Sequence, residues 1–500
     1  MTRLFALLTT LMFSCLSLNA QVVDDALRYS RLEFGGTARS MGVGGALGAL
    51  GTDFAVLSTN PAGLAAYRSS DFMFTPTFKF MNTSSTLAGN SAKDDGSVRL
   101  LLDNIGYVYA SQPLETKWEA LNFGIGTNKI ADFFQEFSYE GSSRGSIVDR
   151  FAEQANGFTP DGLYPFEEGL AYDAVAIYDD DGDAFYETDF QLNPNAAIQR
   201  EETVKTTGAI NELVLSFAGN YNHKLMIGAT VGIPLLRYRI ERTYQESDPR
   251  DEVPFFNNLT YNETVETNGA GINLKLGVIY RPIQALRVGV AYHSPTRFQL
   301  TDEWETSFGY DYTFFDLEAN EEVNVPAEPF YQAPGGGPFE YDLTTPSRWI
   351  GSLAFLFQKR GFLTAEMEYL NYGNSSFNLT KEFNDTQTQL DERILNQEVE
   401  NTFDSAINLK LGGEVAVDIF RIRAGYGMFG TSYADKSSFD PNYSFGVGMR
   451  QESFYLDLAY RRSTFSNDYT PYRLVEPTEE QQVANEANIN KIIMTLGFRF

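Results

Sequence analysis

The sequence predicts an all-β fold: a transmembrane β-barrel of about 14 antiparallel strands with an N-terminal plug inside its lumen. Three features of the 500 residues support this fold. From residue 70 onward apolar residues recur at every second position, long and short connections alternate, and the last alternating segment ends on Phe500. Such alternation gives each strand one face for lipid and one face for a polar lumen.

The composition agrees with a barrel and excludes several other classes of protein. Aromatic residues make up 14% of the chain, yet the mean hydropathy is −0.27 and the formal net charge is −28. A barrel accommodates both properties, because lipid-facing and lumen-facing side chains alternate. The acidity excludes nucleic acid as a partner. After residue 20 no run approaches the ~18 apolar residues of a membrane helix.

The first 20 residues are predicted to be a secretory signal peptide. Arg3 precedes an apolar run over residues 4–16, and Ala20 ends the segment at the expected cleavage site. The run is too short to span a bilayer as a helix. Cys15, the one cysteine of the sequence, would leave with the signal, so the mature chain would have neither a disulfide nor a thiolate metal site.

Strand-length segments with period-two alternation fill the chain after residue 70, as Phe72, Phe74, Phe78 and Phe80 on one face illustrate. The predicted strands are 70–83, 100–111, 118–139, 203–222, 223–245, 258–282, 284–302, 345–358, 361–382, 398–417, 419–434, 439–451, 452–466 and 488–500. The connections alternate, with long gaps at 84–99, 140–202, 246–257 and 303–344 and short ones at 112–117, 222–224 and 282–284. Long external loops and short periplasmic turns are typical of membrane barrels, whereas a soluble sandwich gives no reason for them.

The C-terminal residue carries a separate prediction. Phe500 closes the last alternating strand of the chain. A terminal aromatic residue in this position is similar to the signal that the outer-membrane assembly machinery reads. We therefore expect Phe500 to be the assembly signal and the assembly machinery to be a partner of the chain.

Residues 21–69 do not alternate and are predicted to form a compact plug, or hatch, inside the barrel. A run of small residues contains Gly42, Gly44 and Gly45, which can pack closely or adopt positive φ. The segment Asn60-Pro61-Ala62-Gly63 predicts a turn, since Asn-Pro favours turn initiation. The predicted domains are a signal peptide at 1–20, the hatch at 21–69 and the barrel at 70–500.

These hatch segments resemble the FadL family of outer-membrane transporters for hydrophobic compounds. Residues 39–46 are similar to the family's small-residue hatch segment, and Asn60-Pro61-Ala62 to its Asn-Pro-Ala motif. The spelling Arg-Ser-Met-Gly, followed by Asn-Pro-Ala-Gly-Leu, is most similar to the Bacteroidetes branch. The resemblance implies a fourteen-stranded barrel, in agreement with the segments above, and passive uptake of hydrophobic small molecules such as long-chain fatty acids.

The resemblance also implies a lateral gate, because ligands of this family leave sideways through a gap beside a kinked third strand. The candidate gate is the third predicted strand, where Gly124, Gly126 and Asn128 lie at or before the break 128–132. Glycines and bulges weaken pairing between strands. An ordinary bulge at the barrel rim explains the same residues equally well.

Two lysines, Lys275 and Lys410, are candidates for contact with a ligand in the lumen. Each lies between two leucines that would face lipid, so each should point inward. An inward lysine could hold a fatty carboxylate as a charge-assisted pair. Glu366 and Glu368 face inward near Lys410, which favours a structural ion pair there. Lys275 has no obvious partner in the sequence and is the stronger candidate.

Enzymatic activity, cofactors and metal sites are not indicated, and we expect no catalytic residue. His223 and His293, the two histidines of the sequence, are too few for a histidine-based metal cluster. The acidic run 179–183 suggests a calcium loop, but Ile177 and Thr188 occupy its first and last ligand positions, so the pattern fails. Calcium bridging from this run to lipopolysaccharide stays open.

The sequence leaves the function open between transport and binding. The alternative to uptake is a non-transporting binding protein on the same fold, similar to type IX secretion components such as PorV, which dock secreted cargo. A general aqueous porin is disfavoured, because residues 21–69 would obstruct the lumen. The expected partners are a hydrophobic small molecule, outer-membrane lipid and lipopolysaccharide. Fatty acid, aromatic hydrocarbon and haem-like ligands all stay open, with His293 the sole candidate for an axial haem ligand.

Overall fold

The computed structural model describes residues 16–316, 320–327, 330–333, 338–358, 360–381, 385–474 and 481–500. Most of the predicted signal peptide, including Cys15, lies outside these residues. Within them, no helix combines the length and apolar character needed to cross a membrane.

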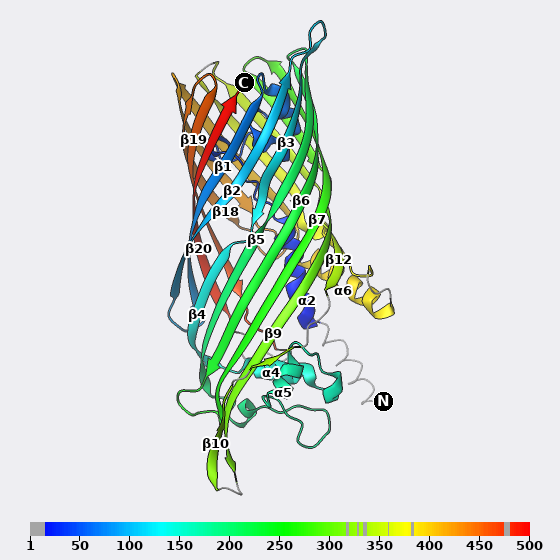
Figure 1. Cartoon of the computed structure of the whole chain (residues 1–500), viewed down its shortest axis with the longest axis vertical. Coiled ribbons are helices and arrows are strands. Elements are labelled where there is room, and N and C mark those ends of the chain that lie inside the picture. The colour runs from blue at the N-terminus through cyan, green and yellow to red at the C-terminus, as the bar shows by residue number, and fades with distance from the viewer. Residues whose placement is uncertain are drawn as a thin grey trace.

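The described strands form one closed antiparallel barrel (Figure 1). Twenty strands belong to a single sheet in this part of the chain, and the sheet closes where β1 pairs with β20. Several strands are pieces of one interrupted wall segment: β3 with β4, β8 with β9, β10 to β13, and β14 with β15. The wall therefore has fourteen segments, and the predicted barrel and its strand number are confirmed.

The bounds of the strands are as follows. They are β1 (Asp71–Leu87), β2 (Lys93–Ser111), β3 (Trp118–Asp132), β4 (Gln135–Arg144), β5 (Ala197–Tyr221), β6 (Leu225–Ser247), β7 (Phe256–Ile283), β8 (Leu286–His293), β9 (Arg297–Asp316), β10 (Glu321–Val325), β11 (Tyr331–Gln332), β12 (Phe339–Thr344), β13 (Arg348–Leu356), β14 (Gly361–Asn371), β15 (Ser376–Asn378), β16 (Ser405–Val417), β17 (Phe420–Gly430), β18 (Phe439–Arg450), β19 (Phe454–Tyr469) and β20 (Val483–Arg499).

An apolar band surrounds the half of the barrel that contains the short turns. On β6 the outward residues Leu225, Ile227, Val231 and Leu235 are all exposed, and the next outward residue, Arg237, is charged. Exposed apolar side chains also follow one another along the neighbouring strands of this half. A continuous apolar belt on a closed barrel is the surface that a bilayer covers, so the fold is a transmembrane barrel.

Several predicted strand boundaries were wrong at the opposite end of the barrel, where the strands continue beyond the apolar band. β1 and β2 extend to leave only residues 88–92 as a connection, although 84–99 was predicted as a long loop. β9 likewise runs through the first part of the predicted loop 303–344. Beyond the apolar band no lipid requires apolar outward residues, so the alternation that marks a strand in the sequence weakens, although β9 still buries Phe308 and Tyr310 under the cap. Residues 398–402, predicted as strand, end the helix α6 (Thr386–Thr402).

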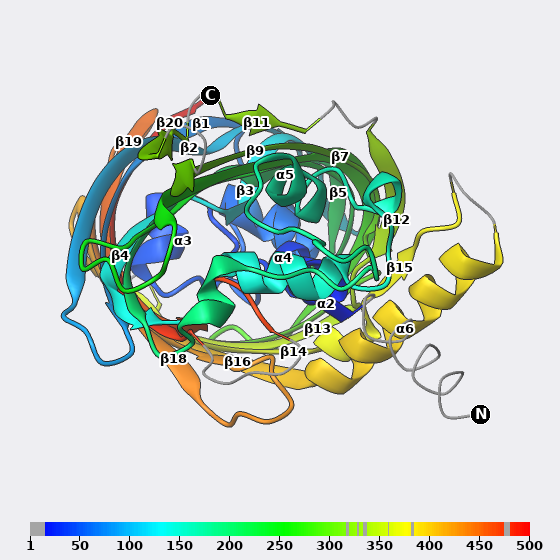
Figure 2. The same cartoon turned by 90° about the horizontal axis from the view of Figure 1, so that it is seen from below.

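Helical segments cover the end with long connections and fill the lumen. α4 (Ile147–Ala155) and α5 (Glu168–Asp173) pack over the barrel mouth and form a cap, seen end-on in Figure 2. The hatch comprises α2 (Leu16–Ser30), α3 (Ala38–Gly42) and the 3-10 helices η1 (Phe54–Ser58) and η2 (Pro61–Ala66). These N-terminal elements lie inside the barrel (Figure 2), as the predicted plug requires.

Candidate functional site: the hatch and the break in the barrel wall

Asn60 fixes the turn of the predicted Asn-Pro-Ala motif. Its side-chain Oδ1 accepts a hydrogen bond from the Ala62 backbone N–H at 3.2 Å and so caps η2. Its Nδ2 donates to the Gly48 carbonyl at 2.7 Å, which joins two parts of the hatch. Pro61 occupies the first turn of η2, where its fixed φ and missing N–H cost nothing. The motif thus caps η2 and ties it to the Gly48 region of the hatch.

The barrel wall approaches this motif closely because three glycines face it. Gly228, Gly277 and Gly289 lie on the adjacent strands β6, β7 and β8. A Cβ atom at Gly277 would lie 2.0 Å from Asn60 Oδ1, and one at Gly228 would lie 2.5 Å from the Pro61 carbonyl. Only a strand without side chains at these positions lets η2 rest against the wall. Sequence reasoning missed these glycines; the signal available was glycine at inward positions of three successive strands.

A second glycine contact holds the small-residue segment on the opposite wall. A Cβ at Gly425 of β17 would lie 2.2 Å from the Gly44 backbone nitrogen, and Gly44 itself has a φ of +68°. Gly45 also has positive φ, at +81°, so both predicted hatch glycines are used for turns. Gly42 needs its small size for another reason, since a Cβ there would meet Gly446 of β18 at 3.3 Å.

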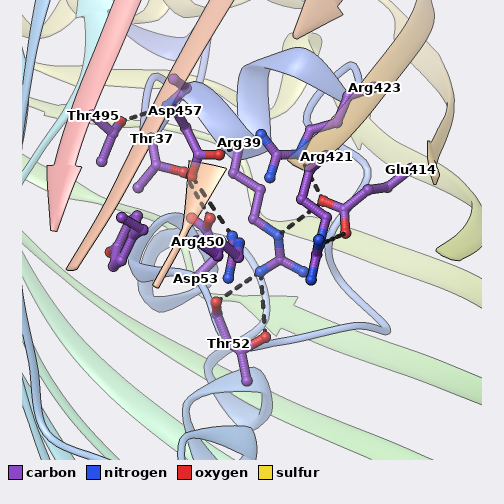
Figure 3. Close-up of polar contacts among 12 residues, drawn as sticks. Thr37, Arg39, Thr52, Asp53, Glu414, Arg421, Arg423, Arg450, Asp457 and Thr495 are labelled. Carbon is purple, nitrogen blue, oxygen red and sulfur yellow. Dashed lines mark hydrogen bonds and ion pairs between the residues drawn. The ribbon is translucent and has the colours of Figure 1, made fainter. Parts of the chain in front are cut away.

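Arg39 connects this part of the hatch to the wall through a buried network (Figure 3). Its guanidinium donates to the Thr52 carbonyl at 2.7 Å, and its Nε lies 3.8 Å from Glu414. Glu414 also pairs with Arg423 at 2.7 Å, and Arg423 pairs with Asp457 at 2.6 Å. From the hatch to the wall the charges thus alternate in sign: Arg39, then Glu414 on β16, Arg423 on β17 and Asp457 on β19. This network fixes the orientation of the hatch.

Both lysines predicted as ligand contacts point inward, but both are paired. Lys410 lies 3.0 Å from Glu366, whose other oxygen accepts from the Gly48 N–H of the hatch at 3.0 Å. This is the ion pair favoured from the sequence. The prediction that Lys275 has no partner was wrong, because it forms a buried ion pair with Glu212. Glu212 also accepts from Ser58 of the hatch at 2.8 Å.

His293, the possible axial ligand of a haem, is occupied by the hatch. Its Nε2 lies 2.6 Å from the Thr59 carbonyl, and the residue is 3% exposed. Because Nε2 donates this bond, it is not free to bind iron in this arrangement. The acidic run at residues 179–183 is different, since the carboxylates of Asp179, Asp181 and Asp183 come within 4.8 Å of one another on the cap. Exposed carboxylates often gather in this way without a metal ion.

The wall is interrupted beside β3, next to the predicted gate. Gly124, Gly126 and Asn128 themselves lie in a regular ladder with β2, which ends at the pair Asn104–Asn128. Leu57 and Phe54 of the hatch pack against Gly124 and Gly126. The Asn128 Nδ2 donates a hydrogen bond to the Ser58 hydroxyl at 2.9 Å. The irregularity begins two residues later, where Ile130 is an extra residue in the pairing of β3 with β5.

Beyond this bulge β4 pairs with β5 but, in the described ladders, not with β2. Residues 93–103 of β2 therefore pair on one side only, with β1. A cavity of about 330 Å³ lies against the interruption and is lined among others by Leu101, Phe134 and Leu235. Leu235 is the last apolar outward residue of β6, so the interruption lies at the outer edge of the apolar band.

The N-terminal segment closes this interruption from the lumen. The backbone N–H groups of Glu33 and Gly35 donate to the carbonyls of Ile130 and Lys129, both at 2.9 Å. These are carbonyls of β3 beyond its ladder with β2. The Glu33 carboxylate also pairs with Arg461 at 2.6 Å and with Lys491 at 3.0 Å. We call residues 31–35 the inner strap; it joins the hatch, β3 and the wall at β19 and β20.

Phe500 lies at the end with the short turns, at the outer surface. Its backbone N–H donates to the Ser70 carbonyl at 3.1 Å, and its ring stacks on Tyr107 with centroids 6.2 Å apart. The side chain is 69% exposed, so it is accessible to a binding partner. Its role as assembly signal stays a prediction.

Comparison with solved structures agrees with this architecture. A FadL homologue from Pseudomonas aeruginosa superposes with a TM-score of 0.54 at 14% identity, covering 94% of this chain and 99% of that one. The chain has the fold of a FadL homologue. Two toluene transporters align at 12% identity and lower TM-scores: TodX of P. putida (0.49; 93% and 99% covered) and TbuX of Ralstonia pickettii (0.47; 93% and 98%). No family model and no curated protein sequence matches the chain.

Proposed function

We propose that this protein is a passive outer-membrane channel for hydrophobic small molecules, such as long-chain fatty acids, and that it releases them sideways into the membrane. The observation that carries the proposal is the interruption between β2 and β4, with its 330 Å³ cavity at the outer edge of the apolar band. A sealed barrel wall would leave an apolar molecule no exit except through the hatch. An opening at this level leads directly into the outer leaflet.

The cap supports capture of apolar molecules from outside. Phe158, Tyr164, Phe185 and Leu192 are between 40% and 62% exposed on the connection between β4 and β5. Large exposed apolar side chains on an otherwise acidic surface are typical of binding surfaces. The names of the similar structures point the same way, since two of them are toluene transporters.

The lumen is closed between the cap and the interruption, so transport requires movement. α2 and the inner strap occupy an apolar section of the lumen together with Ile130, Tyr238 and Phe298. The cavity between the strap and the hatch has a volume of only about 20 Å³, room for one water molecule. An apolar ligand would compete with α2 and the strap for the same apolar wall. Displacing the strap frees the carbonyls of β3 and opens the interruption to the lumen.

The charges on the strap set how readily it moves. Glu33 holds Arg461 and Lys491, and Arg31 pairs with Asp440 at 2.8 Å. Lys275 and Lys410 pair with acidic groups that also bind the hatch, so in the resting state they hold the hatch and do not present a free ammonium to a ligand. A fatty carboxylate would gain access to Arg461 and Lys491 when Glu33 leaves. The proposed ligands therefore include amphiphiles with one anionic end.

Flux into proteoliposomes tests the proposal. Purified protein should accelerate entry of labelled oleate or toluene, and Glu33→Gln should raise the rate severalfold because the strap is held less tightly. Asp468→Asn, which removes an exposed pair with Lys436 away from the interruption, is the matched control and should leave flux unchanged. Absence of protein-dependent flux for every apolar compound would refute transport. Stable co-purification of secreted cargo without flux would instead support the docking alternative.

A further inference from the structure

Two arginines face each other inside the barrel at the end with the short turns. The β7–β8 hairpin pairs Tyr280 with Val288 and Ile283 with Leu286, and Arg281 and Arg287 lie between these pairs. Arg281 contacts the buried, inward Met226, with Nη2 3.7 Å from its Sδ, and Arg287 donates to the Leu50 carbonyl of the hatch at 2.5 Å. Both side chains therefore point inward. Like charges placed opposite each other on neighbouring strands destabilise a sheet.

A third arginine, Arg68, adds to the same positive field. Arg68 follows η2 at the exit of the hatch, is exposed, and repels both Arg281 and Arg287. Across the described residues, none of the three forms an ion pair with a carboxylate. The Nε atoms of Arg281 and Arg287 are buried and have no hydrogen-bond partner within that same set of residues. Buried donors left without a partner cost roughly 1–3 kcal/mol each.

The missing carboxylate is not a consequence of composition. The chain has 66 acidic and 38 basic residues, so acidic partners are in excess. Elsewhere inside the barrel arginines are neutralised: Arg348 pairs with Glu368 at 2.8 Å, and Arg423 pairs with both Glu414 and Asp457. The chain has a net charge of −28, yet this one group of guanidiniums has no acidic partner among the described residues. We therefore infer that the compensating negative charge comes from outside the chain.

We propose that Arg68, Arg281 and Arg287 form a binding site for a phosphate group at the periplasmic mouth of the barrel. Guanidinium groups bind phosphate through paired, charge-assisted N–H donors, and one phosphate oxygen set can serve several arginines at once. The site lies on the periplasmic side of the hatch, so it stands apart from the lateral route and does not depend on the proposed transport function.

The height of the site in the membrane fits the headgroup of an inner-leaflet phospholipid. Tyr280 and Tyr221 are exposed at the ends of β7 and β5, and Trp118 opens β3 nearby, with its ring 5.3 Å from that of Tyr221. Aromatic residues at strand ends mark the level of lipid headgroups in membrane barrels. The phosphate group is thus supplied either by a phospholipid or by free phosphate in the periplasm.

Phosphate-dependent thermal stability tests the site. In phosphate-free detergent, inorganic phosphate should raise the unfolding temperature of the wild-type barrel, and the double variant Arg281→Gln/Arg287→Gln should lose at least tenfold in phosphate affinity. Arg281→Gln alone should be at least as stable as wild type without phosphate, because the repulsion is removed while Arg287 keeps its bond to the Leu50 carbonyl; a merely structural role of Arg281 predicts the opposite. Arg360→Gln, at another short turn, is the control and should respond to phosphate like wild type.

Native mass spectrometry then distinguishes the two sources of phosphate. Wild-type protein from nanodiscs of phosphatidylglycerol and phosphatidylcholine should retain phosphatidylglycerol, and the double variant should not, if a headgroup fills the site. Response to inorganic phosphate without lipid retention would support the free anion. If wild type and double variant respond equally to both ligands, the proposal is overturned. A normal shift between heated and unheated samples on a gel would show that the double variant is folded.

Discussion

Replacing Gly277 with alanine should unseat the hatch without harming the barrel. The new methyl carbon would lie 2.0 Å from Asn60 Oδ1 and 3.0 Å from both the Ala62 nitrogen and Pro61 Cδ. Because Cβ atoms do not approach oxygen this closely, the Asn60 side chain must move by about 1 Å or more. It would then lose its bonds to Ala62, at 3.2 Å, and to Gly48, at 2.7 Å.

The size of the effect follows from these two losses. Overpacking a close contact costs about 1–3 kcal/mol, and leaving a buried amide unpaired costs about 1–3 kcal/mol more. A loss of roughly 2 kcal/mol, the lower end, already raises the undocked fraction of the hatch about 30-fold. The outward ladder residues are unchanged, so the barrel itself should keep its stability.

Leakage of a small polar dye from proteoliposomes measures the undocked hatch. Gly277→Ala should leak markedly faster than wild type, with the same difference in gel migration between heated and unheated samples. Gly351→Ala is the matched control, because a Cβ on Gly351 of β13 meets nothing within 4 Å. Wild-type impermeability of Gly277→Ala would refute the reasoning, since it would mean that the glycine cradle does not position the Asn-Pro-Ala turn.

Three further predictions concern the motif, a buried charge and the C-terminus. Replacing Asn60 and Pro61 together by alanine should loosen the hatch by ~1–3 kcal/mol and increase small-solute leakage, while heat-modifiability stays normal; misassembly would show that the turn belongs to the folding core. Lys410→Met should destabilise the protein by ~3–5 kcal/mol by leaving Glu366 buried without its cation, and Lys410→Met/Glu366→Gln should recover much of this in a thermal melt; no recovery would contradict a pairwise effect. Deleting Phe500 should lower the amount of assembled barrel without altering signal cleavage, and normal surface levels would count against its sorting role.

The membrane-spanning part of the fold was predictable because lipid imposes a strict pattern. Outward residues such as Ile272, Leu274 and Leu276 must be apolar wherever the bilayer contacts them, which reveals each strand and its register. Beyond the band that constraint ends, and β1 and β2 extend into residues that carry no alternation. The hatch was predictable for the opposite reason, since it lacks alternation in a chain that otherwise shows it.

The ion pair of Lys275 shows what the sequence could not supply. Its partner Glu212 is on β5, two strands away from β7, so the contact spans β6 between them. Gly232 of β6 makes room, because a Cβ there would lie 2.4 Å from the Glu212 carboxylate. Such a contact depends on the stagger of three strands at once. An inward glycine therefore marks a place where a side chain reaches across a strand or where the hatch lies against the wall. This signal is present in the sequence but was not used in the prediction.

The gate was located only approximately from the sequence for a related reason. Gly124 and Gly126 suggested weak pairing, but they are small because Leu57 and Phe54 of the hatch lie against them. The bulge at Ile130 lies within the break predicted at residues 128–132, but it contains no glycine or proline that would identify the extra residue. It becomes visible only when the register of β3 against β5 is known.

Deletion of Ile130 tests the central claim most directly. Lys129 pairs with Asn211 and Ala131 with Ile210, so removing the extra residue restores an unbroken ladder between β3 and β5. The deletion variant should fold, retain an impermeable hatch and lose protein-dependent flux of labelled oleate and toluene. Deletion of Ser437, from the exposed connection between β17 and β18, is the control and should leave flux intact. Wild-type flux through the Ile130 deletion would contradict lateral release at the break in β3.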